Sequence, residues 1–564
     1  MKILSLHCDY IKFKPLQKAL KSVEDLKSKE LVEVKEPLGI FIAVEKGDEV
    51  SLEKAVSELV KNIEDLVSKT KAKAVVLYPY AHLSSDLANP DFAQNVLVES
   101  ENVLKKKKFD VYRAPFGYYK EFELKCKGHP LSELSRSLVL GGEVSEEKYD
   151  SQQLLRQISK SKLDTSKLKE NDHRILGQRL DLFSFNETAP GMVFWHNNGL
   201  VIYNELADFW REMHRKNGYQ EIKTPQIMDS KLWKISGHWD KYKENNFVTE
   251  YEKRTFLVKP MSCPGGILVF KSTPKSYKDL PLRVGELGVV HRCELSGVLA
   301  GLFRVIQFTQ DDAHIYCTEK QIEDEVFKLL DLVDLFYNKF GLEYHLELST
   351  RPEKRIGTDN MWDLAENTLE KVLKKRKFKF KINKGDGAFY GPKIDLHLKD
   401  SLGRTWQCGT IQLDFSMPER FELEYTDKNN KKKRTVMIHN VIYGSLERFI
   451  GILLEHTNGN LPTWLSPIQV RVLSFTDRNQ KASEKVLEEL KQKGIRADGD
   501  FSSTTVNEKV RDAEMLRIPY VIVIGDKEEQ AETIAVRRRG DKKIESVKID
   551  DFVENIKKEI EERK

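Results

Sequence analysis

The chain has 564 residues, of which 40% are hydrophobic and 32% are charged, a balance ordinary for proteins that fold in water. At roughly 100–200 residues per domain, this length predicts three or four domains. The net charge of +5 is mild for this size. No run approaches the ~18 apolar residues of a membrane span, so we expect no membrane partner. An acid appears within residues 1–9, too early for a signal peptide, so we expect a cytoplasmic location.

The cysteines are scattered along the chain, whereas the basic residues are clustered in runs. Six cysteines form no CxxC pair, which argues against a disulfide framework and a zinc ribbon. Each basic run alone is typical of a solvated surface, but several runs on one long chain indicate a phosphate-rich partner. These runs are 105–108, 374–377, 431–434 and 537–539.

Residues 1–142 alternate short apolar runs with helical patterns, which predicts a domain of mixed strands and helices. We predict strands at 3–6, 39–44, 74–80 and 109–114 and helices at 52–67 and 92–104. The pair Gly141-Gly142 opens a polar stretch, 143–170, with little apolar periodicity. We predict a linker there, with room for one short helix.

The longest block, 171–465, holds most of the tryptophans and of the turns marked by glycine and proline. The last block, 466–564, predicts a small α/β domain of about 100 residues. In it, 469–475 predicts a strand and 479–493 a helix that Gly494 ends. Tyr520–Ile524 is almost purely β-branched, as is typical of a buried parallel strand.

Three segments of the middle block suggest its chemistry. The first holds Arg292 and continues through 301–314, the second holds Arg448, and the third ends at Pro225. An arginine within a strand or helix is more often part of a structural ion pair. Taken together, however, the segments resemble the three signature motifs of class II aminoacyl-tRNA synthetases, with Pro225 as the motif-1 proline, Arg292 as the motif-2 arginine and Arg448 as the motif-3 arginine.

Neighbouring strings narrow the resemblance to the threonyl-tRNA synthetase family, from residue 171 to the end of the chain. They are Lys-Pro-Met-Ser-Cys-Pro-Gly at 259–265, Phe-Thr-Gln-Asp-Asp-Ala-His at 308–314, Phe-Tyr-Gly-Pro-Lys at 389–393, Trp-Gln-Cys-Gly-Thr-Ile-Gln-Leu-Asp-Phe at 406–415 and Met-Ile-His at 437–439. The resemblance implies a multidomain α+β and α/β protein with a class II core, an antiparallel sheet flanked by helices. It also implies a homodimer with motif 1 at the interface.

The activity implied is that of an ATP-dependent threonine–tRNA ligase, which makes threonyl-adenylate and diphosphate and then charges tRNA(Thr). Attack of the L-threonine carboxylate on the α-phosphate builds negative charge, which arginines and Mg²⁺ bound with ATP stabilise. By resemblance, Arg292 holds the α-phosphate and the carboxylate, and Arg448 holds the γ-phosphate. The further ATP-binding residues implied are Glu294 at the adenine, Arg304 at the phosphates, and Phe308 against the adenine ring, with Arg448 on the other side of that ring.

By the same resemblance, Cys263, His314 and His439 bind one Zn²⁺ per subunit, although their spacing alone would nominate no metal site. Three ligands leave one tetrahedral position open, which in this family takes the amino group and hydroxyl of the substrate. Valine lacks that hydroxyl, and a site that engages a hydroxyl can reject such an analogue by ~10⁴–10⁵. The threonine pocket implied consists of Asp312, Tyr390, Lys393, Gln407 and Gln412. Ser262 and Gly266 depart from the Asn and His common in the family beside the cysteine.

Serine keeps both groups and lacks only a methyl, a difference of ~1–3 kcal/mol that is too small for faithful translation. Residues 1–142 resemble the editing domain of archaeal threonyl-tRNA synthetases, which shares the fold of D-aminoacyl-tRNA deacylases and implies an archaeal source. The matching strings are 6–10, 78–84, 114–120 and 129–133.

The editing residues implied are His82, Tyr119, Lys120 and Glu133, although each alone is typical of a turn or a surface. We predict that water hydrolyses seryl-tRNA(Thr), with Lys120 supporting the developing charge and the RNA 2′-hydroxyl assisting.

The last block resembles the class IIa anticodon-binding domain in its strings 510–514, 517–520 and 525–528. Glu528 and Arg537 match residues that read anticodon bases, and each also fits a plain surface charge.

Three alternatives remain. A serine or proline enzyme on the same scaffold is disfavoured by the metal-ligand set and the front domain. An inactive paralogue that only binds tRNA is disfavoured because Arg292, Arg448 and all three metal ligands are retained. A chain that charges tRNA but edits poorly is left open by the sequence.

Overall fold

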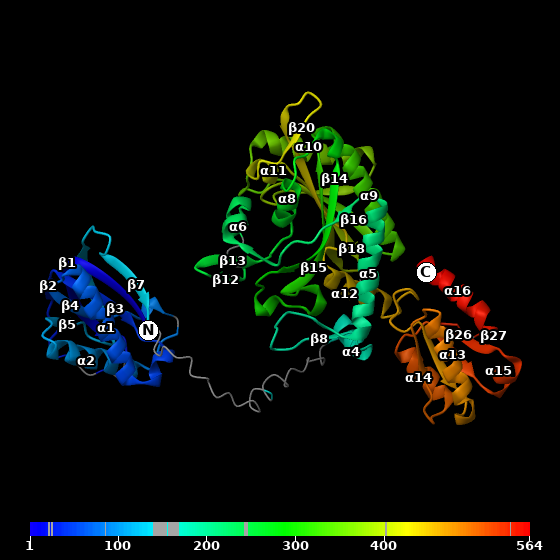
Figure 1. Ribbon diagram of the computed structural model, residues 1–564, viewed down its shortest axis with the longest axis horizontal. Helices are drawn as coiled ribbons and strands as arrows, with labels where there is room; N and C mark the ends of the chain where they lie inside the picture. The colour runs from blue at the N-terminus through cyan, green and yellow to red at the C-terminus, as the bar shows by residue number, and fades with distance from the viewer. Residues whose placement is uncertain are drawn as a thin grey trace. The chain divides into compact units, whose positions relative to one another are not determined.

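The computed structural model describes residues 1–20, 28–84, 86–138, 168–241, 246–400, 403–541 and 543–564, together with Val23, Leu26 and Leu155. The chain divides into two compact units, Met1–Ser151 and Gln152–Lys564, and each is considered on its own (Figure 1). The predicted linker, 143–170, lies almost entirely outside the described residues. Within the described residues, no helix is long and apolar enough to cross a membrane.

The first unit is a mixed sheet in the order β2-β1-β3-β4-β5, with β6 and β7 each paired to β1. Its strands are β1 (Lys2–Lys18), β2 (Val32–Lys35), β3 (Pro37–Ala43), β4 (Ala74–Pro79), β5 (Val111–Arg113), β6 (Tyr118–Cys126) and β7 (Glu133–Ser137). Two helices, α1 (Leu52–Thr70) and α2 (Pro90–Lys106), bury their apolar faces against this sheet. The strands and helices predicted for this block are therefore confirmed. Strands β6 and β7 were not predicted, because most of their residues are polar and exposed.

The second unit contains a sheet in the order β10-β14-β15-β22-β19-β18-β16-β17. Its strands are β10 (Gln220–Glu221), β14 (Leu282–His291), β15 (Gln307–Cys317), β16 (Glu343–Ser349), β17 (Phe380–Asn383), β18 (Lys393–Lys399), β19 (Thr405–Asp414) and β22 (Val436–Val441). The inner strands are antiparallel, as expected, and only the edge pairs β10/β14 and β16/β17 are parallel.

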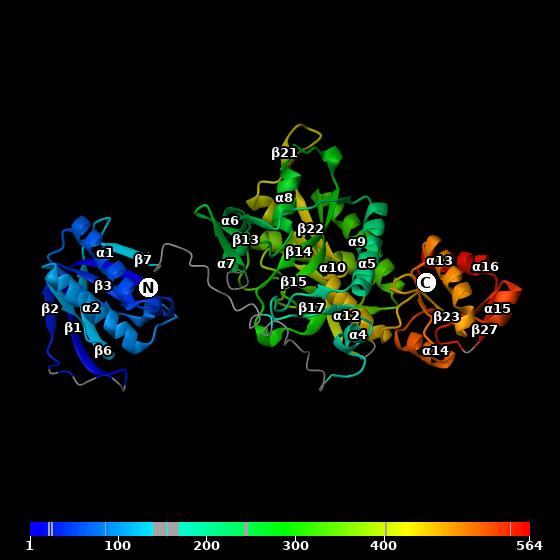
Figure 2. The same ribbon diagram turned by 60° about the horizontal axis from the view of Figure 1, so that its bottom comes forward.

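Helices cover one face of this sheet and leave the other for polar chemistry. They are α5 (Asn197–Lys216), α9 (Ile322–Lys339), α10 (Asp359–Lys375) and α12 (Leu446–Thr457). Their apolar residues form one core with every second residue of the strands, such as Ile394, Ile411 and Ile438. Figures 1 and 2 both show α5 beside α9, and the rings of Phe209 and Phe336 join them with centroids 4.8 Å apart. Because strand residues alternate, the intervening residues face the opposite side.

Smaller elements complete the middle block. They are α4 (His173–Arg179), β8 (Phe183–Ser184), β9 (Phe194–Trp195), β11 (Ile227–Asp229), α6 (Ser230–Ser236), α7 (His238–Lys241), β12 (Val248–Tyr251), β13 (Arg254–Val258), α8 (Cys263–Lys271), α11 (Ser416–Arg420), β20 (Glu424–Thr426) and β21 (Lys432–Arg434). Of these, α4, β8 and β9 pack against the helix-side core, and α6, α8 and α11 lie on the opposite side. A second apolar cluster joins α6, α8 and α11 to the strands through Trp233, Ile267 and Met417.

The last block forms a sheet in the order β24-β23-β25-β26-β27. Its elements are β23 (Val470–Ser474), α13 (Gln480–Gln492), β24 (Ala497–Asp500), α14 (Val506–Met515), β25 (Tyr520–Ile524), α15 (Asp526–Ala531), β26 (Ile534–Arg538), β27 (Ile544–Val547) and α16 (Ile549–Glu561). The predicted strands and helix are confirmed, and Gly494 follows α13 with a φ of +81°. Strand β25 is parallel to β23, as predicted, but antiparallel to β26. A β-branched run indicates burial and does not specify the direction of each neighbour.

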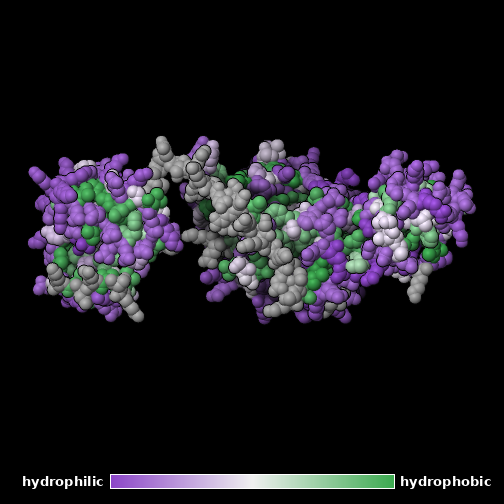
Figure 3. All heavy atoms as spheres, turned by 90° about the horizontal axis from the view of Figure 1, so that it is seen from below, coloured by the Kyte–Doolittle hydropathy of each residue, from purple (hydrophilic) through white to green (hydrophobic). Residues whose placement is uncertain are grey.

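Polar and ionic contacts join the last block to the middle one within the second unit. Arg496 pairs with Glu205 of α5 at 2.6 Å, and Lys339 of α9 donates to the carbonyl of Glu562 at 2.7 Å. Figure 3 shows that hydrophilic residues cover most of the visible face of the last block.

Candidate functional site

Three possible metal ligands from distant parts of the sequence meet on the open face of the central sheet. Cys263 begins α8, His314 lies on β15 and His439 lies on β22. The two histidines are direct cross-strand partners. One ligand atom from each residue lies within 4.8 Å of the others, and all three residues are buried. The fold therefore assembles a group that spacing in the sequence does not reveal.

The surroundings of this group fit a zinc ion. Among the described residues, Nε2 of His314 has no hydrogen-bond partner, and it lies 3.6 Å from a carboxylate oxygen of Asp312. Burial holds the pKa of His314 well below its usual value, which keeps the imidazole in the neutral form that binds metals. Burial also raises the pKa of Cys263, so a cation would be needed to hold its thiolate. One thiolate and two imidazoles match zinc with an open position.

Asp414 supports this group, although it was not among the predicted residues. Its Oδ2 lies 2.9 Å from Nε2 of His439, and its Oδ1 accepts the N–H groups of Ser416 and Met417 at 2.7 and 2.9 Å. A carboxylate that accepts from one ring nitrogen leaves the other nitrogen free of hydrogen for a metal. Asp414 stands two residues after Gln412 on the same strand, so strand alternation was the available signal.

The predicted threonine pocket follows one row of cross-strand partners. His314 lies opposite His439, His439 opposite Gln412, and Gln412 opposite Lys393. These side chains therefore share the open face of the sheet. The ring of Tyr390 lies 5.3 Å from that of His439, which brings Tyr390 to the metal-ligand group as well.

Asp312 stands two residues before His314 and points to the same face. Burial raises its pKa to about 6. Its cross-strand partner is Glu286, which accepts from Nζ of Lys259 at 2.8 Å and from Oγ1 of Thr224 at 3.0 Å. Thr224 directly precedes Pro225, so this buried group links the predicted motif 1 to the pocket. Sequence reasoning missed Lys259 and Glu286, because nothing in their spacing pairs them.

Lys393 and Gln407 meet at one buried carboxylate, that of Asp395. Nζ of Lys393 and Nε2 of Gln407 donate to it at 2.7 and 2.6 Å. The carbonyl of Gln407 in turn accepts from Nη1 of Arg448 at 3.1 Å. Asp395 therefore orients two predicted pocket residues, and Gln407 connects the pocket to a predicted ATP-binding arginine.

The predicted ATP-binding residues lie in the same region. Phe308, Gln310, Asp312 and His314 alternate along β15, so they share one face. The guanidinium of Arg292 lies 5.2 Å from the centroid of the Phe308 ring, and its Nη2 lies 3.5 Å from Oε1 of Gln310. The arginine over Phe308 in this structure is thus Arg292.

The other two arginines predicted to bind ATP form contacts with groups of the protein. Nε of Arg448 donates to the carbonyl of Phe303 at 2.9 Å. Arg304 forms an ion pair with Glu294 at 2.9 Å. Both arginines keep donors beyond these contacts, as planar guanidinium groups have five N–H bonds.

In the first unit, three of the four predicted editing residues line one cavity of about 520 Å³: His82, Tyr119 and Lys120. Nζ of Lys120 donates to the carbonyls of Pro115 and Tyr118, each at 2.9 Å. Burial lowers the pKa of Lys120 to about 8. Lys120 is therefore not the plain surface lysine that it resembles in the sequence.

Glu133 is not among the residues that line this cavity. It begins β7, where it pairs with Leu6 of β1, and it is exposed. The structure therefore separates Glu133 from the lining of the cavity that the other three share.

The two predicted anticodon-binding residues lie on different elements of the last block. Oε2 of Glu528, in α15, accepts the N–H of Gly525 at 3.0 Å. Arg537, on β26, pairs with Glu514 of α14 at 2.7 Å. Each side chain thus has a structural partner within the chain.

Comparison with known proteins identifies all three blocks. Residues 1–138 match the Archaea-specific editing domain of threonyl-tRNA synthetase, residues 246–457 the class II core domain of tRNA synthetases (G, H, P, S and T), and residues 469–559 an anticodon binding domain. The threonine–tRNA ligase of Caldanaerobacter subterraneus subsp. tengcongensis is 55% identical over 392 residues, which are 70% of this chain and 61% of that protein. That of Desulforamulus reducens is 53% identical over 395 residues, 70% of this chain and 62% of that protein.

A solved structure supports the same assignment. The RNA binding domain of threonyl-tRNA synthetase from Cryptosporidium parvum matches with a TM-score of 0.67 and 44% identity, over 69% of this chain and 98% of that one. The chain belongs to the threonyl-tRNA synthetase family. It spans about 61% of the length of the first of these curated relatives.

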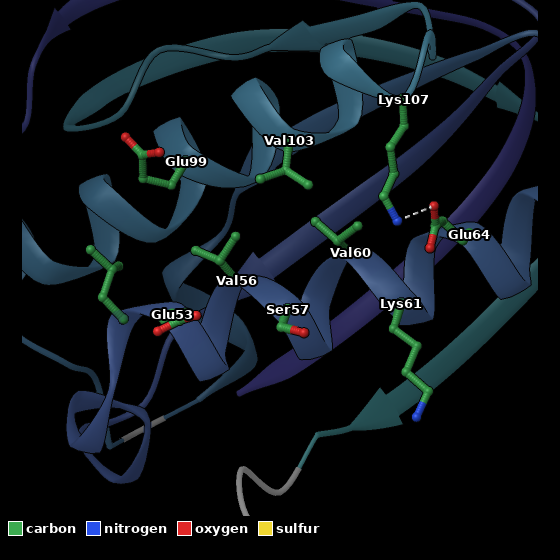
Figure 4. A pocket seen from close by; sticks show the side chains of 10 residues that line it. Glu53, Val56, Ser57, Val60, Lys61, Glu64, Glu99, Val103 and Lys107 are labelled. Atoms are coloured by element: carbon green, nitrogen blue, oxygen red, sulfur yellow. Dashed lines mark hydrogen bonds and ion pairs between the residues drawn. The ribbon is translucent and has the colours of Figure 1, made fainter.

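Another hollow, in the first unit, holds none of the predicted residues. A groove of about 700 Å³ runs between α1 and α2, with Val56, Val60 and Val103 at its floor (Figure 4). Lys107 and Glu64 form an ion pair of 2.7 Å across its end. Its walls carry acids and lysines in mixture, so we assign no ligand to it.

The basic runs pair with acids of the same chain at several positions. In the run 374–377, Lys374 pairs with Glu370 at 2.7 Å, and Arg376 pairs with Asp331. In the run 431–434, Lys433 pairs with Asp427 at 3.3 Å. These ion pairs are typical of a solvated protein surface, and binding of phosphate by the basic runs stays a prediction.

Proposed function

We propose that the chain is an active threonine–tRNA ligase. It activates L-threonine with ATP to threonyl-adenylate, transfers threonine to tRNA(Thr), and hydrolyses seryl-tRNA(Thr) in its first unit. The observation that carries this proposal is the buried group of Cys263, His314 and His439, on the sheet face that also bears Phe308 beside Arg292. A zinc-ligand set and phosphate-binding cations on one face are what selection and activation of a hydroxyl amino acid require.

Each proposed role follows from the chemistry of the side chain. Arg292 holds the α-phosphate and the threonine carboxylate, and Arg448 and Arg304 hold the other phosphates, because a guanidinium meets phosphate oxygens with two parallel hydrogen bonds. Glu294 and Phe308 bind the adenine. Mg²⁺ enters with ATP and spreads the charge that develops on the phosphates.

Amino-acid selection rests on the metal-ligand group. Cys263, His314 and His439 would hold one Zn²⁺ per subunit, which when bound offers an open coordination position to the amino group and hydroxyl of threonine. The remaining proposed threonine-binding residues are Asp312, Tyr390, Lys393, Gln407 and Gln412. Asp312 accepts from the amino group or hydroxyl. Valine offers no hydroxyl, so its binding leaves polar groups of the pocket unpaired.

Serine offers the same two groups, so the proposal includes correction in the first unit. His82, Tyr119 and Lys120 share a cavity whose volume of about 520 Å³ suits an aminoacyl ester. Lys120 supports the negative charge that develops as water attacks the ester carbonyl. Glu133 is retained from the family resemblance alone, since it does not line the cavity.

The wider proposal keeps the domain boundaries 1–142, 143–170, 171–465 and 466–564, with anticodon reading by Glu528 and Arg537. Pro225 is exposed, which suits a homodimer interface at motif 1. Partners are tRNA(Thr), ATP and L-threonine. We propose a cytoplasmic location, where tRNA is charged, and an archaeal source, on the strength of the match at 1–138.

The test is amino-acid-dependent exchange of pyrophosphate into ATP, on purified chain with its zinc content measured. We expect strong exchange with threonine, weaker exchange with serine, and none with valine or proline. Strong exchange with proline, or with serine above threonine, would favour another synthetase. No exchange with any of them, on folded and zinc-loaded protein, would overturn the proposal and favour a paralogue that only binds tRNA.

Editing is tested separately by adding seryl-tRNA(Thr) and threonyl-tRNA(Thr) made with another enzyme. We expect rapid deacylation of the seryl ester only. If threonine is activated while the seryl ester stays intact, the chain charges tRNA but edits poorly.

A further inference from the structure

A buried histidine outside the sets above connects three parts of the second unit. His173 is the first residue of α4, and only 1% of it is exposed. It contacts Glu455 on α12 and the short turn Gly301–Phe303, which precedes β15. Glu455 is 282 positions away in the sequence.

The hydrogen bonds of His173 fix its protonation pattern. The backbone N–H of Leu302 donates to Nε2 at 3.0 Å, so this nitrogen carries no hydrogen. Nδ1 therefore carries the hydrogen and donates to Oε1 of Glu455 at 2.7 Å. The backbone N–H of His173 donates to the same oxygen at 3.1 Å.

The same hydrogen bonds exclude a metal site at this group. Asp172, His173 and Glu455 place potential ligand atoms within 4.8 Å of one another. Both ring nitrogens of His173 are already engaged with protein groups, so neither is left for a metal. The group is a structural connection instead.

The turn Gly301–Phe303 packs directly on the imidazole. The ring centroids of His173 and Phe303 are 4.2 Å apart. The Phe303 ring also packs on Trp406, with centroids 4.3 Å apart. Gly301 has a φ of +53°, and a Cβ added there would lie 2.2 Å from Nε2 of His173. The position of the turn is therefore set by His173.

The turn and α12 both hold arginines of the proposed ATP site. The carbonyl of Phe303 accepts from Nε of Arg448 at 2.9 Å, and Arg304 follows the turn directly. Glu455 stands seven residues after Arg448 on α12, about two helical turns away. The Phe303 carbonyl and helix α12, two of the supports of Arg448, are thus both tied to His173.

We propose that His173 is a positioning residue for ATP binding: it fixes the turn Gly301–Phe303 against α12, so that Arg304 and Arg448 are held ready for the phosphates. This inference rests on the proposed function. His173 does not touch the metal-ligand group, so its loss should weaken ATP binding and leave threonine selection intact.

Two substitutions separate the contacts of His173. In His173→Asn, the side-chain amide stands where Nδ1 stands and retains a donor for Glu455, but nothing reaches Leu302. In His173→Gln, the longer side chain places an acceptor near the position of Nε2 and can retain the bond from Leu302. Gly301→Ala displaces the turn from the other side and should reproduce the effect of His173→Asn.

The measurements are the Kd of a non-hydrolysable ATP analogue and the KM values for ATP and threonine in pyrophosphate exchange. A buried N–H left without a partner weakens a state by ~1–3 kcal/mol, so we expect about tenfold weaker ATP binding in His173→Asn. His173→Gln should lie nearer the unaltered chain. Zinc content and the KM for threonine should change less than about twofold.

Two results would overturn the inference: unchanged ATP binding in His173→Asn and Gly301→Ala, or equal losses for ATP and threonine together with a lower Tm. The second result marks a merely structural residue. Absence of exchange in the unaltered chain would instead overturn the proposed function, and the Kd of the ATP analogue would still report on His173.

Discussion

Asp414 offers the sharpest test of the proposed zinc site, because one substitution can reverse a hydrogen bond while keeping the local backbone. In Asp414→Asn, the amide oxygen can still accept the N–H groups of Ser416 and Met417, which now donate to Oδ1 at 2.7 and 2.9 Å. The amide nitrogen then faces Nε2 of His439, where Oδ2 stands now at 2.9 Å. Because the amide nitrogen of asparagine donates, Nε2 of His439 must accept, and the imidazole then carries its hydrogen on Nδ1.

A histidine with its hydrogen on the metal-facing nitrogen is a poor ligand. Loss of such an orienting partner typically weakens metal affinity 10–100-fold, or about 1.4–2.7 kcal/mol. We therefore expect Asp414→Asn to bind zinc 10–100-fold more weakly in competition with a chromogenic chelator. Threonine-dependent exchange should fall at limiting zinc and recover in part at high zinc.

Asp395→Asn is the matched control for zinc affinity. Asp395 is also a buried carboxylate on the open sheet face, but its partners include Lys393, Gln407 and Ser349 and no metal ligand. Its substitution should leave zinc affinity unchanged while altering threonine binding. A folded Asp414→Asn protein that binds zinc as tightly as the unaltered chain would refute the assignment of His439 through this hydrogen bond.

Three further outcomes follow from the contacts of single side chains. Burial lowers the pKa of Lys120 to about 8, so the ammonium of Lys120 is lost as pH rises through 8. The background-corrected rate of seryl-tRNA(Thr) hydrolysis should therefore fall above that pH, and Lys120→Arg should flatten the pH profile in that range. Arg448→Lys loses the planar fork that bonds the Phe303 and Gln407 carbonyls through two nitrogens, so the KM for ATP should rise about tenfold with the KM for threonine unchanged. Arg537→Gln should reduce charging of tRNA(Thr) about tenfold and leave pyrophosphate exchange unchanged.

Local patterns predicted the elements whose periodicity is strong. Helix α1 and strand β25 carry clear apolar spacing, and both were predicted close to their observed limits. Strand β6 was missed because its more buried face carries the charged Lys120 and the exposed Phe122, so polarity does not follow burial along it. The direction of β26 relative to β25 depends on a connection through α15, which periodicity does not encode.

The candidate site depended on resemblance more than on pattern. Cys263, His314 and His439 stand on three separate elements, and only the pairing of β15 with β22 makes two of them neighbours. Asp414 could have been predicted from the sequence, because it follows Gln412 by two residues and so lies on the same face of the strand. His173 was not, since its role depends on Glu455, which is 282 positions away.

The volume of the cavity proposed for editing does not by itself distinguish a serine ester from a threonine ester. A cavity of about 520 Å³ lies within the ~300–1,000 Å³ typical of small-ligand sites, and one methyl group is a small fraction of it. A serine ester and a threonine ester can both enter such a space. The distinction must then arise at the reacting carbonyl, where the extra methyl competes for room with the attacking water beside Lys120 and Tyr119. We therefore expect threonyl-tRNA(Thr) to inhibit hydrolysis of the seryl ester competitively while resisting hydrolysis itself.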